Sequence, residues 1–286
     1  MQNHRQLKRI LYWVTIGILV AVILVCGGLI ANKFISDAKD KAEYESLQDL
    51  VPDVTRPPIP TGNGTEPGVT DPPKDPNIPD ATEPDKERPS FFPESDILYQ
   101  YRALYEINHD MVGYIDIPGT NIQYPVVQST YQANYYLRRN FYKRSATCGT
   151  IYVREACDVN KPSDNVTIYG HKMRNGTMFA ELHNYKEQSF WEENRYIYFD
   201  TLTEYHTYEI FAVFQTPANT TESFNYHLFD DAQNEIHYND FISQCKSLSY
   251  YDTEITPVYG EKLITLSTCD KDIEDGRLVV VARRVL

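Results

Sequence analysis

The chain is short of cysteine and of positive charge. Its 286 residues include five cysteines, and 27 Lys and Arg face 40 Asp and Glu, for a formal net charge of −13. So few cysteines do not make a disulfide-rich scaffold. An acidic balance also argues against binding to nucleic acid, which needs clustered Lys and Arg to neutralise phosphates. No cluster of residues with metal-ligand spacing is visible, so we expect neither a metal nor another cofactor.

Charge is also missing from one long stretch near the N-terminus, Ile10–Ala31. Its 22 residues would extend about 33 Å as a helix, enough to cross a bilayer core of roughly 30 Å. Arg5, Lys8 and Arg9 precede the stretch, and this positive flank favours a cytoplasmic N-terminus. We therefore expect residues 1–35 to be a cytoplasmic tail and a single-pass signal anchor in the cell membrane, with the remaining chain extracellular.

Composition changes sharply after this anchor. Residues 52–93 hold 12 of the 17 prolines, mixed with Thr, Asp, Glu and Gly. Such a segment cannot bury enough apolar surface to offset its ordering entropy, so residues 36–95 are predicted to be a polar stalk and a disordered tether. Fully extended at about 3.1 Å per residue, the proline-rich part would reach roughly 130 Å. A head domain on such a tether could work far from the membrane.

Residues 96–286 are predicted to form one globular domain without repeats. Helical spacing of Leu98, Tyr101, Leu104 and Ile107 predicts a first helix, capped by Ser95 or Asp96. Eight short runs of strand character follow, at Val112–Ile117, Ile122–Val127, Gly149–Val153, Val166–Tyr169, Tyr196–Phe199, Thr207–Phe214, Leu263–Leu266 and Leu278–Val285.

Two further helical segments interrupt the strands, at roughly Met178–His183 and at Asp230–Leu248. In the second, one face is apolar, with Tyr238, Phe241, Ile242, Cys245 and Leu248. Many short strands with scattered helices favour a mainly β fold, a closed barrel with added helices. For the cysteines of this domain two alternatives stay open, a Cys148–Cys157 disulfide or buried thiols.

The last two strand runs carry a cysteine and an arginine at their facing ends. "TLSTCD" ends one run at Cys269, and Arg277 opens the next, "RLVVVARR". If the runs are antiparallel neighbours, the loop between them holds both side chains at one end of the sheet. A thiolate nucleophile gains from a nearby cation, and arginine keeps its charge. The structural alternative is a half-buried cysteine beside a strand-edge arginine.

A histidine at a third strand end completes a candidate constellation. His171 follows the apolar run "NVTIYG", so its imidazole starts a loop supported by a rigid strand. The other six histidines lie in the cytoplasmic tail, in helix-like segments or in polar connections. Cys, His and Arg at strand ends suit acyl transfer, in which a base activates the nucleophile.

The motifs together resemble those of the sortases, the membrane-anchored cysteine transpeptidases of Gram-positive bacteria. "YGHKM", "TLSTC" and "RLVVVARR" carry the likeness, which spans roughly residues 96–286 and includes "VGYIDIPGTNIQYPVVQ" and "GTIYV". "YLRRNF", "GTMFAEL" and the helix at Asp230–Leu248 resemble class B specifically. The resemblance implies a closed eight-stranded β-barrel, with an N-terminal helix and a helix inserted before the last two strands.

The resemblance also implies roles for the constellation. Cys269 would attack the Thr carbonyl of a C-terminal sorting signal and form a thioacyl-enzyme, and His171 would act as general acid and then general base. Arg277 would position the substrate carbonyl and stabilise the oxyanion. Positions that line the family's substrate groove are matched by Asn134, Leu137, Tyr169, Ser267 and Asp270. The implied partners are secreted proteins with a sorting signal and an amine of a peptidoglycan precursor or a pilin.

Two other classes of function are alternatives to this one. An L,D-transpeptidase-like or cysteine-protease hydrolase is one, but an L,D-transpeptidase would carry an arginine shortly after the cysteine, and "STCDKD" has none. A non-catalytic binding module on a stalk is the other, and the intact set of Cys, His and Arg argues against it.

Overall fold

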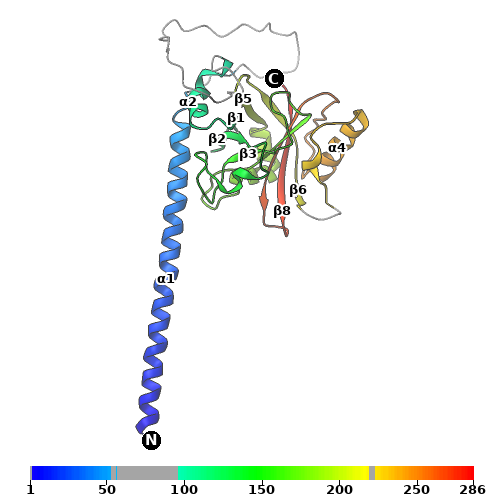
Figure 1. Ribbon diagram of the computed structural model, residues 1–286. Helices are drawn as coiled ribbons and strands as arrows, with labels where there is room; N and C mark the ends of the chain where they lie inside the picture. Colours follow the sequence, from blue (N-terminus) through cyan, green and yellow to red (C-terminus); the bar gives the residue numbers. More distant parts are fainter. Residues whose placement is uncertain (1, 53–55, 57–95, 219–222) are drawn as a thin grey trace, which may run out of the picture. The chain divides into compact units, whose positions relative to one another are not determined.

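The computed structural model describes residues 2–52, 56, 96–218 and 223–286 (Figure 1). The chain divides into two compact units, Met1–Asp49 and Leu50–Leu286. The first unit consists of α1 (Gln2–Gln48). Within this helix, Tyr12–Gln48 contains a window that is long and apolar enough to cross a membrane, with a mean hydropathy of 2.8. The helix is therefore consistent with the expected membrane anchor. Most of the expected tether lies outside the described residues.

The second unit contains a closed barrel of eight strands in the order β1-β2-β3-β4-β7-β8-β6-β5. The strands are β1 (Met111–Asp116), β2 (Gln123–Gln128), β3 (Ile151–Val153), β4 (Asn165–Tyr169), β5 (Tyr196–Thr201), β6 (Thr207–Pro217), β7 (Leu263–Asp270) and β8 (Gly276–Arg284). Each of the eight predicted strand runs is present, with bounds shifted by a few residues. The predicted mainly β fold with a closed eight-stranded barrel is confirmed.

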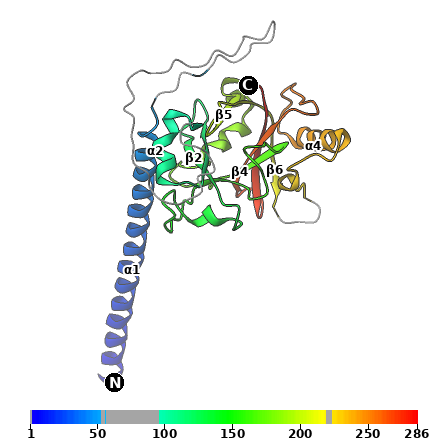
Figure 2. The same ribbon diagram turned by 45° about the horizontal axis from the view of Figure 1, so that its top comes forward.

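Helices and short 3₁₀ turns decorate the barrel. They are α2 (Tyr99–Ile107), η2 (Tyr135–Arg138), η3 (Ala180–Lys186), α3 (Gln188–Glu193), η4 (Tyr226–Leu228) and α4 (Glu235–Leu248). The N-terminal helix α2 and the helix α4, inserted between β6 and β7, lie on opposite sides of the barrel (Figures 1 and 2). Both were expected from the sequence. The predicted helical segment near Met178–His183 is the 3₁₀ turn η3, which starts two residues later and leads into α3.

Strand pairing brings the ends of β4, β7 and β8 together. β4 runs parallel to β7, with Tyr169 opposite Ser267, while β7 runs antiparallel to β8, with Cys269 opposite Arg277. Parallel strands finish at the same edge of a sheet. The carboxyl ends of β4 and β7 and the amino end of β8 therefore share one end of the barrel, which we call the β7 end.

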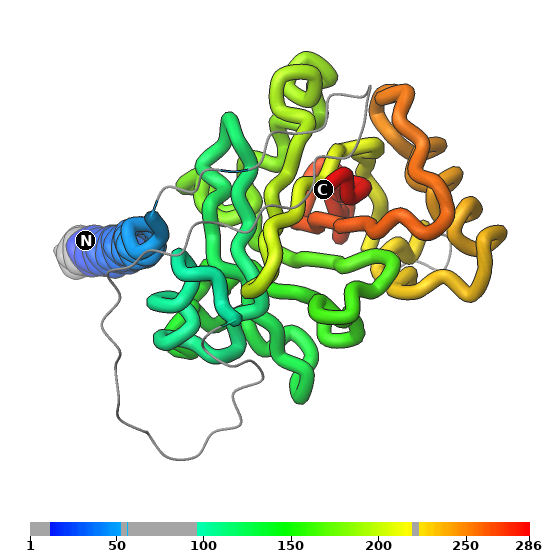
Figure 3. The backbone as a smooth tube through the Cα atoms, turned by 90° about the horizontal axis from the view of Figure 1, so that it is seen from above, coloured from blue at the N-terminus to red at the C-terminus, as the bar shows by residue number. Residues whose placement is uncertain are grey.

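The helix α4 covers the outer surface of β6 and β8, and Figure 3 shows it (gold) at the margin of the domain. Its Tyr238, Phe241, Ile242 and Cys245 are buried in one apolar cluster with side chains of both strands. Because β8 is covered on both faces, its apolar run is continuous rather than alternating. Leu248, the last residue of the helix and the fifth residue of the predicted apolar face, is 42% exposed.

Two local expectations are settled by the structure. The N-cap position of α2 is Leu98 rather than Ser95 or Asp96, its side chain forms no cap hydrogen bond, and Ser95 lies outside the described residues. Cys148 and Cys157 are both buried as thiols, so the disulfide alternative is wrong.

Candidate active site

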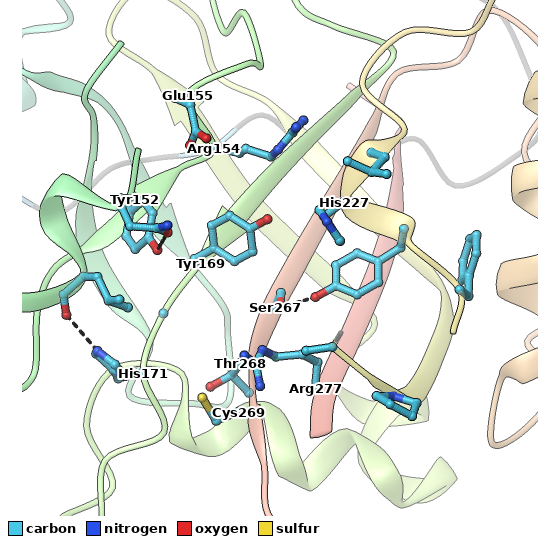
Figure 4. Close-up of a pocket in the computed structure, with 18 residues that line it drawn as sticks. Tyr152, Arg154, Glu155, Tyr169, His171, His227, Ser267, Thr268, Cys269 and Arg277 are labelled. Atoms are coloured by element: carbon cyan, nitrogen blue, oxygen red, sulfur yellow. Dashed lines mark hydrogen bonds between the residues drawn. The ribbon is translucent and has the colours of Figure 1, made fainter. Parts of the chain in front are cut away.

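A pocket of about 500 Å³ opens at the β7 end of the barrel (Figure 4). Its lining comes from the ends of β4, β7 and β8, from the segment after β3, and from the connection between β6 and α4. Cys269, His171 and Arg277 all line it. The structure thus brings together the three residues that the sequence placed at separate strand ends. Within the described ranges, no group of His, Cys, Asp and Glu side chains is arranged to hold a metal ion.

Cys269 and Arg277 are direct cross-strand neighbours on β7 and β8. The side chain of Cys269 is exposed although its neighbours in the strand are buried, so the thiol is accessible from the pocket. The tight connection between the strands depends on Gly276. A Cβ at this position would lie 2.7 Å from the backbone oxygen of Asp270, which only glycine avoids.

The guanidinium of Arg277 is held by its own loop. Nη1 donates to the backbone oxygens of Gly276 at 2.9 Å and of Asp275 at 3.2 Å, and the side chain extends towards Thr268 and Cys269 (Figure 4). Among the described residues, no carboxylate forms an ion pair with Arg277. Its positive charge is therefore fixed beside the thiol and is not neutralised by the protein.

His171 lies two residues after the end of β4. Its Nε2 is 2.8 Å from the backbone oxygen of Leu137, and because a carbonyl only accepts, the ring carries a proton on Nε2. Burial lowers the pKa of His171, and the nearby cation of Arg138 lowers it further, against the opposing effect of the Leu137 hydrogen bond. The neutral imidazole is therefore favoured at pH 7.

Gly170 makes this position of the histidine possible. A Cβ on Gly170 would lie 2.5 Å from the side chain of Ile151 and 2.6 Å from that of Phe179. Strand β4 can therefore pass close to both side chains before it turns into the loop of His171.

Four of the five predicted groove residues line the pocket, namely Asn134, Leu137, Tyr169 and Ser267. Asn134 has a left-handed backbone (φ 56°), and its side-chain oxygen accepts a hydrogen bond from Tyr152 at 2.8 Å. The backbone oxygen of Asn134 accepts the N–H of Leu137 at 3.0 Å. Leu137 is thereby held where its carbonyl meets His171.

Asp270 is the predicted residue that does not line the pocket. Side chains alternate along a strand, so the residue after Cys269 points to the opposite face of β7. There its carboxylate is buried and lies 2.6 Å from Nζ of Lys186, in η3. Burial alone would raise the pKa of Asp270, but the hydrogen bond from Lys186 holds it below its usual value. Asp270 thus fastens the β7–β8 loop to η3.

Two tyrosines of the pocket's aromatic wall, Tyr152 and Tyr226, were not found from the sequence. Tyr226 of η4 is buried, and its hydroxyl lies 2.7 Å from Oγ of Ser267. Tyr152 and Tyr169 face each other across β3 and β4, with ring centroids 5.4 Å apart. A sequence signal existed for Tyr226, since "FNYHLF" is an unusually aromatic run in a connection between strands.

A second histidine, His183, links the loop of His171 to the backbone of Cys269. Nδ1 of His183, in η3, is 3.1 Å from Nζ of Lys172, and its Nε2 is 3.2 Å from the backbone oxygen of Cys269. The ammonium of Lys172 only donates, so Nδ1 accepts and Nε2–H donates to Cys269. Burial lowers the pKa of His183, which keeps this neutral form at pH 7. The loop that carries His171 is thereby joined to the backbone of Cys269.

Comparison with known proteins shows which family shares this sequence and fold. A family model described as the sortase domain matches residues 115–285. Sortase B of Listeria monocytogenes is 35% identical over 190 residues, 65% of this chain and 74% of that protein. Sortase B of Staphylococcus aureus is 27% identical over 280 residues, 97% and 98% of the two chains. A crystal structure of sortase B complexed with triglycine has a TM-score of 0.59 and 28% identity, covering 65% of this chain and 85% of that one.

Proposed function

Because this chain belongs to the sortase family and is similar to sortase B, a cysteine transpeptidase, we propose that it cleaves a C-terminal sorting signal after Thr and transfers the protein to an amine. The acceptor is an amine of a peptidoglycan precursor or of a pilin. Membership of this family also rules out the L,D-transpeptidase-like and the non-catalytic alternatives. The N-terminal apolar helix anchors the enzyme, with the N-terminus cytoplasmic and the catalytic domain, residues 96–286, extracellular.

In the first half of the reaction, the thiolate of Cys269 attacks the Thr carbonyl carbon. The new C–S bond forms a tetrahedral intermediate, which collapses when the C–N bond breaks. The minor fraction of molecules in which His171 is protonated is the reactive one: His171 supplies the proton for the leaving amine through Nδ1, because its Nε2–H is occupied by Leu137. In the second half, the acceptor amine attacks the thioester and gives a proton back to His171, and Cys269 leaves as thiolate.

Arg277 stabilises the oxyanion in both halves. Its guanidinium is fixed opposite Cys269, and it has no carboxylate partner among the described residues to compete with the substrate. Charge-assisted N–H donors that are in place before the reaction are worth several kcal/mol at an oxyanion, typically about 3–4. This pairing of Cys269 with Arg277, in one pocket with His171, is the observation that carries the proposal.

The substrate peptide occupies the pocket lined by Asn134, Leu137, Tyr169 and Ser267. Asp270 has no direct contact with it in this proposal. The sortase B structure with triglycine supports an amine as the second substrate, since triglycine offers a free amino group.

The test is mass spectrometry of the acyl-enzyme formed from a peptide library by the wild-type enzyme and by Cys269→Ala. We expect adducts on Cys269 that end in Thr, no adduct with Cys269→Ala, and release of the adduct when triglycine or a lysine peptide is added. Adducts that end in another residue would overturn the cleavage site. Release by water at the same rate without an amine would overturn transfer, and a peptide library that leaves Cys269 unmodified would overturn the role of the thiol.

A further inference from the structure

Arg56, from the proline-rich segment, is bound to the outer surface of the barrel. Its Nη1 donates to Oδ1 of Asp200 at 2.7 Å, and its Nη2 lies 3.9 Å from Oδ2 of Asp116. Its guanidinium carbon is 4.1 Å above the ring of Tyr198. Asp116, Tyr198 and Asp200 come from the paired strands β1 and β5, and we call these three residues the Arg56 seat.

The seat lies on the outer face of the barrel, next to α2. Tyr114 is the cross-strand neighbour of Asp200, and its ring stacks on that of Tyr101 in α2, with centroids 5.4 Å apart. The hydroxyl of Tyr101 donates to Oδ2 of Asp200 at 2.5 Å. Burial raises the pKa of Tyr101 and the charge of Asp200 raises it further, so the phenol keeps its proton and remains a donor.

Asp200 needs a cation at this position. Its side chain is fully buried, and besides Tyr101 it accepts the backbone N–H of His206 at 3.2 Å. Two hydrogen bonds do not neutralise a buried carboxylate, whose removal from water costs several kcal/mol. In the described parts of the chain, Arg56 is the cation that forms an ion pair with Asp200. The side chain of Arg56 is 13% exposed, so the pair is largely shielded from water.

Seven residues separate Arg56 from the end of α1 at Gln48. An extended chain advances at most about 3.6 Å per residue, so these residues span at most roughly 30 Å. The whole proline-rich segment, in contrast, would reach roughly 130 Å when extended. Residues 57–95 follow Arg56 and lead back to the same domain at Asp96, so they add no length between the membrane helix and the seat.

We propose that the Arg56 seat fastens the tether to the catalytic domain, so that the seven residues before Arg56 set the reach of the enzyme. Release of Arg56 lengthens the connection by the whole of residues 57–95. The proposal relies on α1 being the membrane anchor. It confines the catalytic pocket to acceptor amines and sorting signals that are presented near the membrane surface.

Energy transfer in the full-length protein tests this reach. The protein, with Cys26→Ala, is placed in lipid nanodiscs, a donor dye is attached to the exposed thiol of Cys269, and acceptor dyes are attached to lipid headgroups. We expect a loss of transfer efficiency in Arg56→Ala, because the domain then moves farther from the lipids. Arg88→Ala removes the same charge from the same proline-rich segment and is expected to match the unsubstituted protein.

A third variant separates reach from stability. In Arg56→Ala the carboxylate of Asp200 is left without its partner, so the domain could lose stability as well as its fastening. The double variant Arg56→Ala/Asp200→Asn removes that buried charge and is expected to regain melting temperature while transfer stays low. Equal transfer efficiency in the unsubstituted protein and in Arg56→Ala would overturn the proposal. So would the same loss in Arg88→Ala. Neither result depends on peptide cleavage, so failure here leaves the proposed reaction standing.

Discussion

Arg277 in the pocket and Arg56 in its seat differ in how the guanidinium is satisfied. Arg277 donates to backbone oxygens of its own loop, while Arg56 pairs with the carboxylate of Asp200 and lies over Tyr198. In the pocket, the protein leaves a fixed positive charge without an acidic partner. In the seat, the same group is neutralised and largely buried. An arginine without an acidic partner beside a nucleophile is available to a substrate, and one that pairs with a buried acid contributes to folding.

The largest effect is expected when Arg277, in the pocket, is replaced. Arg277→Lys should lower kcat/KM by about 10²–10³, because an ammonium does not reproduce the fixed N–H donors of a guanidinium. Melting temperature should change little, since a partly exposed arginine adds only about 0–1 kcal/mol to folding. Steady-state kinetics on one cleavable peptide, with melting curves alongside, provide the measurement. Near-normal turnover would mean that any positive charge suffices there.

In the Arg56 seat, we expect a loss of stability without a loss of activity. Arg56→Ala should lower the free energy of unfolding by about 2–3 kcal/mol, somewhat less than a fully buried pair, because Asp200 keeps two hydrogen bonds. For the folded enzyme, kcat/KM on a soluble peptide should stay within about twofold, since the seat does not line the pocket. Urea unfolding followed by assay of the same preparation measures both quantities. Loss of activity with unchanged stability would reverse the comparison between the two arginines.

A smaller loss of activity is expected when His183 is replaced. His183→Ala removes the donor to the backbone oxygen of Cys269 and should lower kcat by about 10-fold, an effect of about 1.4 kcal/mol, with little change in KM. His183→Gln retains an N–H donor and should recover most of the loss. If both variants lose the same activity together with stability, the contact is only part of the packing of η3.

The smallest effect concerns the pH profile. The acidic limb of kcat/KM reports the lower pKa of the free enzyme, which we assign to His171, so it should lie below pH 6.5. The cation of Arg138 disfavours the imidazolium, so Arg138→Gln should raise the pKa of His171 and move the limb to higher pH. Arg139→Gln is the matched control. A limb that moves downward in Arg138→Gln would show that another group sets it.

Local sequence patterns predicted much of the barrel but not how it closes. Apolar runs such as Leu263–Leu266 mark strands, yet β7 continues to Asp270 because its pairing with β8 persists beyond the apolar part. The parallel pairing of β4 with β7 joins segments far apart in the chain, and no local pattern specifies it. The placement of Cys269 beside Arg277 was predictable, since it needs only an antiparallel neighbour.

The features that could not be predicted from the sequence depend on individual tertiary contacts. Asp270 was expected in the groove, although strand alternation already predicts that it points away from Cys269. Arg56 was predicted to be part of the tether because its neighbours are prolines and polar residues. A prediction from the composition of a whole segment does not detect the contact of a single arginine. Its partner Asp200 lies 144 residues away, so only the folded chain reveals the ion pair.

The parallel pairing of β4 with β7 also has a kinetic consequence. Its partners, such as Tyr169 and Ser267, are about a hundred residues apart in the chain, and non-local pairings of this kind raise the contact order and slow folding. The loop between them must close before the end of β4 can approach the end of β7. Cys269 and Arg277 are joined early by a short hairpin, but His171 meets them only when the whole barrel has formed. A newly synthesised chain therefore carries a thiol that remains catalytically silent until global folding is complete.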